Sequence, residues 1–196
     1  MKSRSHANRG KPLEDLVKFA NERYRYHGVA CINKQATEFI PLRDRSGRIV
    51  SCKVEEKATV DFLGRYYNIP IAIEAKHTAT EAISFDAVQE HQADFMDDYT
   101  RQPGTIGMVL VSFDMKRFFA IPWVFWQAAY NARIRPGATR TTPVTVSAFG
   151  VTWDIPKKKS VRVDELEPSW EIPNYNSTYG IHYLEKASQY ITPSQP

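Results

Sequence analysis

The sequence predicts an α/β domain in which a central mixed β-sheet is flanked by helices. Residues 12–25 carry apolar side chains at helical spacing, and Pro12 suits the first turn, where its missing N–H costs nothing. Residues 69–76 alternate like a half-buried strand, and residues 106–113 form an apolar run of buried-strand length. Helix and strand patterns in this succession are typical of a sheet covered by helices.

The other elements are predicted from turn residues and periodicity. Further strands are expected at 29–32, 59–63 and 117–121, and further helices at about 84–99, with Ser84 as a candidate N-cap, and at 122–132. The arginine-rich stretch around the turn-like residues 44–47 favours a projecting hairpin or irregular arm. Composition after residue 133 predicts loops, one short strand near 144–153, and a weakly ordered segment after Pro168.

Composition excludes several classes of protein. Hydrophobic residues make up 42% of the chain, enough for a core, and no apolar run approaches the roughly 20 residues of a membrane span. The polar, basic residues 1–11 lack the apolar stretch of a signal peptide, so we expect a soluble, cytoplasmic protein without membrane contact. Cys31 and Cys52 have no CxxC or paired CxxH spacing, which argues against a disulfide scaffold or zinc site.

The net charge of +4 is unevenly distributed. Basic residues gather at 2–11, 43–57 and 157–162, whereas residues 77–100 contain acids and no lysine or arginine. Clustered positive charge neutralises phosphates and releases counterions, so the pattern favours nucleic-acid binding. A solvated surface is the alternative for any single cluster.

The most informative spacing joins Asp61 to Glu74-Ala75-Lys76. Strand alternation places Glu74 and Lys76 on one face, and Asp61 belongs to the expected hairpin partner. Two carboxylates from adjacent strands can hold a hard divalent cation, to which the Ala75 carbonyl could add a ligand. A lysine beside them can position water or stabilise negative charge. An acid and a lysine two residues apart are also common on exposed strands, so spacing alone leaves both readings open.

Several motifs, in this order, resemble those of one family: Asn8-Arg9-Gly10 before Leu13-Glu14, Thr59-Val60-Asp61-Phe62-Leu63-Gly64, Ile73-Glu74-Ala75-Lys76-His77-Thr78, His91-Gln92, and residues 159–166. Together they resemble the RecU-type Holliday-junction resolvases of the PD-(D/E)xK nuclease superfamily. The resemblance spans roughly residues 4–168. The sequence departs from it at Val60, where the superfamily has proline, at His77, and in the tail after Trp170, which has no counterpart.

The resemblance implies a restriction-endonuclease-like core with a protruding stalk at about 34–57. It divides the chain into a nuclease domain at 1–168 and a C-terminal extension at 169–196. Family members are homodimers that nick four-way DNA junctions symmetrically with Mg²⁺ or Mn²⁺ in recombination and repair. A recombinase or branch-migration protein as a further partner is left open. The family occurs in bacteria and their phages, so the cytoplasm would be the host's for a phage protein.

The resemblance also assigns roles to individual residues. The expected catalytic residues are Asp61, Glu74, Lys76 and Glu14, with Asp61, Glu74 and the Ala75 carbonyl as metal ligands. Gln92 would support the site, and the expected DNA contacts are Arg9, Lys11, Arg43, Arg45 and Arg48. Two alternatives remain: a PD-(D/E)xK nuclease of duplex specificity, and a non-catalytic, junction-binding accessory protein of recombination. For Glu14, a favourable interaction with the helix dipole is the competing explanation.

Overall fold

A six-stranded sheet forms the centre of the computed structural model, which describes residues 10–56, 58–134, 144–148, 151–155, 158–173 and 177–190. The strand order is β1 (Ala30–Lys34), β4 (Phe62–Tyr66), β5 (Ile69–Thr78), β7 (Ile106–Phe113), β8 (Arg117–Pro122), β12 (Glu171–Ile172). Strands β5 and β7 are parallel and the other neighbours are antiparallel. The predicted mixed sheet is confirmed.

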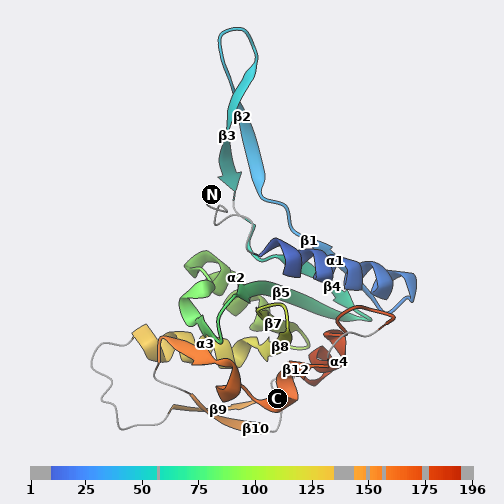
Figure 1. The fold of residues 1–196 in the computed structure, drawn as a ribbon, viewed down its shortest axis with the longest axis vertical. Coiled ribbons are helices and arrows are strands. Elements are labelled where there is room, and N and C mark those ends of the chain that lie inside the picture. Colours follow the sequence, from blue (N-terminus) through green and yellow to red (C-terminus); the bar gives the residue numbers. More distant parts are fainter. Residues whose placement is uncertain are drawn as a thin grey trace.

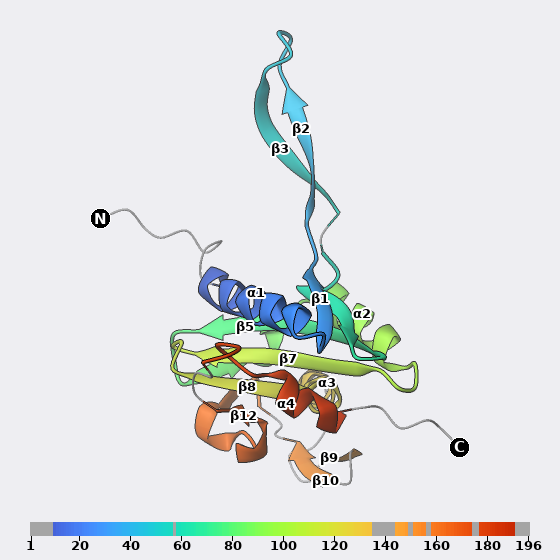
Figure 2. The same cartoon turned by 90° about the vertical axis from the view of Figure 1, so that its right-hand side faces the viewer.

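Helices cover the two faces of this sheet (Figures 1 and 2). Helix α1 (Lys11–Tyr26) and the C-terminal segment with α4 (Leu184–Ala187) lie on one face, and α2 (Glu90–Thr100) and α3 (Trp123–Ile134) lie on the other. The apolar side chains predicted at helical spacing lie on the buried face of α1, which includes Leu13, Val17, Ala20 and Tyr24. Every residue of β7 is buried, as expected for a strand covered on both faces.

The predicted arm is an antiparallel hairpin of β2 (Glu38–Arg43) and β3 (Ile49–Glu56), which projects away from the sheet (Figures 1 and 2). Asp44 closes its tip, because one carboxylate oxygen accepts the backbone N–H groups of Ser46 and Arg48. These bonds, with one from the Ser46 hydroxyl, lower the pKa of Asp44. Gly47 has a φ of +82°, which a side chain would strain. Lys34 belongs to β1, so the hairpin, called the stalk below, begins after it.

Three predicted boundaries were wrong. Strand β4 begins at Phe62 rather than residue 59. The helix expected at 84–99 divides into a 3-10 turn, Phe85–Ala87, and α2, because the intervening Val88 and Gln89 are extended. Ser84 does cap a helix, but it is the short one, through the N–H of Asp86. Instead of one strand near 144–153, β9 (Val144–Ala148) and β10 (Val151–Ile155) form an antiparallel pair.

The described residues after Pro168 are packed rather than weakly ordered, so that prediction was wrong. A 3-10 turn (Pro168–Trp170) leads into β12, which extends the central sheet beside β8. The large aromatic and aliphatic side chains of this segment are buried: Trp170, Ile172, Ile181, Tyr183, Leu184, Tyr190. The Tyr190 hydroxyl donates to the Ala120 carbonyl oxygen at 2.8 Å. These widely spaced apolar side chains find partners only in the folded chain, so local composition understates the order.

The last elements are short: β6 (Ala82–Ser84) pairs with β11 (Ser160–Arg162), and 3-10 turns cover Val163–Glu165 and Ser188–Tyr190. In the described part of the chain, no helix has the length and apolar character to cross a membrane.

Candidate active site

Asp61 and Glu74 are held against each other where β4 meets β5. Phe62 pairs with Ile73, so Asp61, one residue before β4, stands opposite Glu74. The Asp61 N–H donates to Glu74 Oε2 at 3.1 Å, and the Ala75 N–H donates to Asp61 Oδ2 at 2.9 Å. Each carboxylate is therefore fixed by the backbone of the other strand.

Gly64 allows β1 to run close beside the strand that follows Asp61. A Cβ atom at this position would lie 2.1 Å from the Cys31 carbonyl oxygen and 2.5 Å from the Ile32 Cα. Neither backbone atom can move without displacing β1. The glycine of the Thr-x-Asp-x-x-Gly motif therefore has a packing role that keeps Asp61 in register with its neighbours.

Lys76 completes the cluster from the same face of β5 as Glu74. Its Nζ lies 2.6 Å from Glu74 Oε1 and donates to Gln92 Oε1 of α2 at 3.2 Å. The same amide oxygen accepts the Gln89 N–H at the start of α2, at 3.0 Å. Gln92 thus orients the lysine and ties the site to the first turn of the helix.

Burial raises the pKa values of both carboxyl groups. The Glu74 side chain is almost inaccessible, and burial together with the Asp61 charge raises the Glu74 pKa to about 7, although Lys76 opposes the shift. Burial also raises the pKa of Asp61, against the Ala75 N–H and Lys76, and the charge of Glu14 adds to the rise. Two carboxylates, one buried and one partly buried, with one ammonium are short of positive charge, which is the condition that a bound cation relieves.

Glu14 lies near the pair but is not joined to it. Its carboxylate forms an ion pair with Lys34 at the end of β1, and it faces Asp61 closely enough to affect the pKa of that residue. Within the described residues there is no cluster of three histidine, cysteine, aspartate or glutamate side chains that could hold a metal. Glu14 is therefore placed beside the site, not as a third ligand.

The chemistry of the donor set fits a hard divalent cation. The side-chain donors are carboxylate oxygens, and Glu74 Oε1 is buried with no well-directed hydrogen bond, only the ion pair with Lys76. The Ala75 N–H points to Asp61, and a strand residue directs its N–H and C=O to the same side. The Ala75 carbonyl oxygen is thus on the side of Asp61, where it can add a ligand.

The expected DNA contacts are spread over the molecule. Lys11 is exposed at the start of α1, and Arg43, Arg45 and Arg48 are exposed at the tip of the stalk. Arg9 lies outside the described residues. In the third basic cluster, Arg162 pairs with Glu81 and Asp164, and Lys158 pairs with Glu165. The charges of Lys158 and Arg162 are therefore largely neutralised, whereas Lys159 is exposed and Lys157 lies outside the described residues.

Sequence reasoning missed a cavity of mixed charge beside the site. It has a volume of 160 Å³, lies between α1 and β1, and is lined partly by Lys18, Glu22, Arg25 and Lys34. Lys18 and Lys34 form ion pairs with Asp15 and Glu14. Lys18 and Arg25 are seven residues apart and share one side of the helix. That spacing indicates a polar side of the helix, but Lys34 lies beside it only because β1 packs on α1.

A carboxylate pair and a lysine on adjacent strands of a mixed α/β sheet form the arrangement of the PD-(D/E)xK nucleases. The profile of the family described as "RecU: Recombination protein U" matches residues 8–146. The chain belongs to this family.

Relatives named "Holliday junction resolvase RecU" match at modest identity. The protein from Streptococcus oralis is 29% identical over 62% of this chain and 65% of its own length, and that from Mycoplasmopsis pulmonis 28% over 50% and 58%. The chain thus spans less than two thirds of these two relatives. The Bacillus licheniformis protein is 24% identical over 98% of this chain and 90% of its own length.

Among solved structures, the chain is similar to Archaeoglobus fulgidus Hjc, a Holliday junction resolvase from an archaeal hyperthermophile. The TM-score is 0.34 at 11% identity, over 57% of this chain and 75% of the other. This likeness is too partial to define the fold.

Proposed function

We propose that this protein is a metal-dependent endonuclease that cuts four-way DNA junctions in recombination and repair. One observation carries the proposal: Asp61, Glu74 and Lys76 meet at one point at the base of an arginine-tipped stalk. The Gln35 N–H, just before the stalk, donates to the Asp61 carbonyl oxygen at 2.8 Å. The stalk and the candidate catalytic residues are therefore directly connected. The names of the relatives support junction DNA as the substrate.

In this proposal Asp61, Glu74 and the Ala75 carbonyl hold Mg²⁺, for which Mn²⁺ can substitute. When bound, the cation supplies positive charge beside the scissile phosphate. Lys76 can direct an N–H at a phosphate oxygen or at the attacking water, because Gln92 and Glu74 hold its Nζ in place. Glu14, restrained by Lys34, is suited to orient water at the edge of the site.

Substrate selection is assigned to the stalk and to Lys11. Arg43, Arg45 and Arg48 at the tip can contact phosphates at the centre of the junction, while Lys11 contacts a flanking strand. Such contacts recognise shape and charge and read little base sequence. Symmetric nicks need two sites related by a two-fold axis, and each chain holds one, so we propose a homodimer. Its mass in solution, by light scattering, tests this.

The decisive experiment compares variants in cleavage and in binding on a synthetic four-way junction. Asp61→Asn and Lys76→Ala should each lower the cleavage rate by about 10³-fold or more while leaving junction affinity in EDTA within a few-fold. Cleavage should need Mg²⁺ or Mn²⁺ and stop in EDTA. Asp98→Asn, an exposed carboxylate on α2, is the control and should cut normally.

Other outcomes of this experiment distinguish the alternatives. Equal cutting of linear duplex and junction would favour a duplex nuclease. Junction binding without any cleavage, unaffected by Asp61→Asn, would favour a non-catalytic accessory protein and would refute the proposal.

A further inference from the structure

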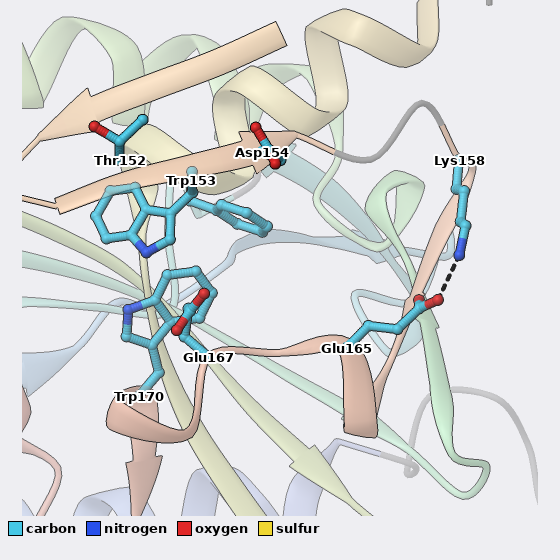
Figure 3. Close-up of a pocket in the computed structure, with 8 residues that line it drawn as sticks. Thr152, Trp153, Asp154, Lys158, Glu165, Glu167 and Trp170 are labelled. Carbon is cyan, nitrogen blue, oxygen red and sulfur yellow. Dashed lines mark hydrogen bonds and ion pairs between the residues drawn. The ribbon is translucent and has the colours of Figure 1, made fainter. Parts of the chain in front are cut away.

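A second cavity lies beyond the β12 edge of the sheet, whereas the candidate active site lies toward the β1 edge. Figure 3 shows its walls, which come from α3, β10 and the segment leading to β12. The volume is 380 Å³, at the small end of the range for ligand pockets. Of its eight lining residues only Phe125 falls within the segment that the family profile matches.

Three aromatic rings form the floor of this cavity. The ring centroids of Phe125 and Trp170 are 4.7 Å apart, and those of Trp153 and Trp170 are 5.5 Å apart. Trp153 and Trp170 are only 5% and 2% exposed, so their positions are fixed by packing. Only small parts of these rings reach the cavity, so they form a rigid aromatic floor with little exposed area.

Negative charge surrounds the aromatic floor. Lys158 is paired with Glu165, as the dashed line in Figure 3 shows, so these two charges offset each other. Asp154 and Glu167 are exposed and have no ion-pair partner among the described residues. Glu167 and Trp170 both line the cavity, as Figure 3 shows. The unpaired charge of the described lining is therefore −2, from Asp154 and Glu167.

We propose that this cavity binds a basic side chain, arginine above lysine, presented by a partner protein. A guanidinium group pairs with carboxylates through its planar fork and is weakly enough hydrated to lie against the exposed parts of aromatic rings, so one side chain can contact both features of the lining. Complementary charge selects this occupant: DNA phosphates would be repelled by Asp154 and Glu167, and a neutral apolar group would gain nothing from either carboxylate. A partner held here leaves the stalk free for the junction.

The test is an NMR titration of the full chain with an end-capped Gly-Arg-Gly peptide. The chain has four tryptophans, whose indole N–H signals are assigned with single Trp→Phe variants. The peptide should shift the signals of Trp153 and Trp170 and leave the other two in place. The same peptide with citrulline, the neutral isostere of arginine, should bind at least fivefold more weakly.

Variants locate the carboxylates responsible. Glu167→Gln and Asp154→Asn should each weaken arginine binding by about threefold, as expected for solvent-exposed ion pairs, and the double variant should weaken it further. Asp98→Asn is the control and should bind like the unaltered chain. Unchanged remaining indole signals in each variant would show that the fold is intact.

Four results would overturn the proposal. The first is the absence of Trp153 and Trp170 shifts at millimolar peptide, and the second is equal binding of the citrulline and arginine peptides. The third is competition by four-way junction DNA, because that would assign the cavity to nucleic acid. An affinity that stays the same in the double variant would equally rule out the carboxylates as the binding groups.

Discussion

Shortening the stalk should separate junction recognition from catalysis. Replacing residues 40–53 with Asn-Gly would connect Phe39 to Val54 through a two-residue turn. These two residues are already paired across the hairpin. The replacement leaves β1, β4 and the Gln35–Asp61 contact untouched. It removes one acid and four cationic residues: Arg43, Arg45, Arg48, Lys53.

The magnitude follows from counterion release. Each neutralised phosphate contributes about 0.9 to the slope of log affinity against log salt, so four cations account for roughly 3 to 4 slope units per chain. Between 50 and 200 mM salt the intact protein should lose affinity for junctions much more steeply than the shortened one. Affinity for linear duplex should change less, because Lys11 and the active site are retained.

Binding is measured in EDTA, so that cleavage does not interfere, on a four-way junction and a linear duplex of equal length. A triple variant of Arg43, Arg45 and Arg48 to glutamine keeps the hairpin and removes only charge. If the stalk reads shape as well as charge, the shortened protein should discriminate junction from duplex less well than this variant. An unchanged salt slope together with an unchanged affinity ratio in the shortened protein would refute the role given to the stalk.

Further predictions concern stability. The pKa of Glu74 is raised from 4.5 to about 7, so the folded state binds the proton of this carboxyl group more tightly than the unfolded state does. The metal-free protein should therefore lose up to roughly 3 kcal/mol of stability as pH rises across that interval. Urea unfolding in EDTA measures this loss, which Glu74→Gln should remove; a stability that rises with pH over the same interval would contradict the assignment. Gly64→Ala should cost roughly 3 kcal/mol because its Cβ would meet the Cys31 carbonyl, and a neutral result in the same assay would show that β1 can shift. Tyr183→Ala, at a fully buried ring, should cost about 3–5 kcal/mol, whereas Tyr67→Ala, at a ring 62% exposed, should stay within about 0.5 kcal/mol. Similar losses for the two tyrosines would mean that the tail does not stabilise the domain.

Local periodicity was enough to place the centre of the candidate site. Side chains alternate along a strand, so Glu74 and Lys76 had to share a face once residues 69–76 were taken as a strand. A hairpin turn at Tyr67-Asn68 then brings the preceding strand alongside. The error of three residues at the start of β4 did not matter, because pairing of Phe62 with Ile73 still sets Asp61 opposite Glu74.

Local sequence patterns could not predict the contacts between segments that are distant in the sequence. The pairing of Glu14 with Lys34 depends on how α1 packs on β1, and no local pattern encodes that packing. The tail was misjudged for the same reason. The Tyr183 hydroxyl reaches Asn21 of α1 across more than 160 residues, and its ring is buried only because the helix and sheet are already in place.

The ion pair within the site offsets part of the cost of placing a buried carboxylate beside a partly buried one. Glu74 is nearly inaccessible and faces Asp61, an arrangement that would be costly if both were charged and unpaired. Lys76 offsets part of this cost, and the raised pKa values of both acids show that the remainder is not compensated. A divalent cation would supply the missing charge and displace the Glu74 proton, so metal affinity should weaken below about pH 7, the pKa of that carboxyl group. The residues proposed to hold the cation are then the same residues whose burial would make its binding favourable.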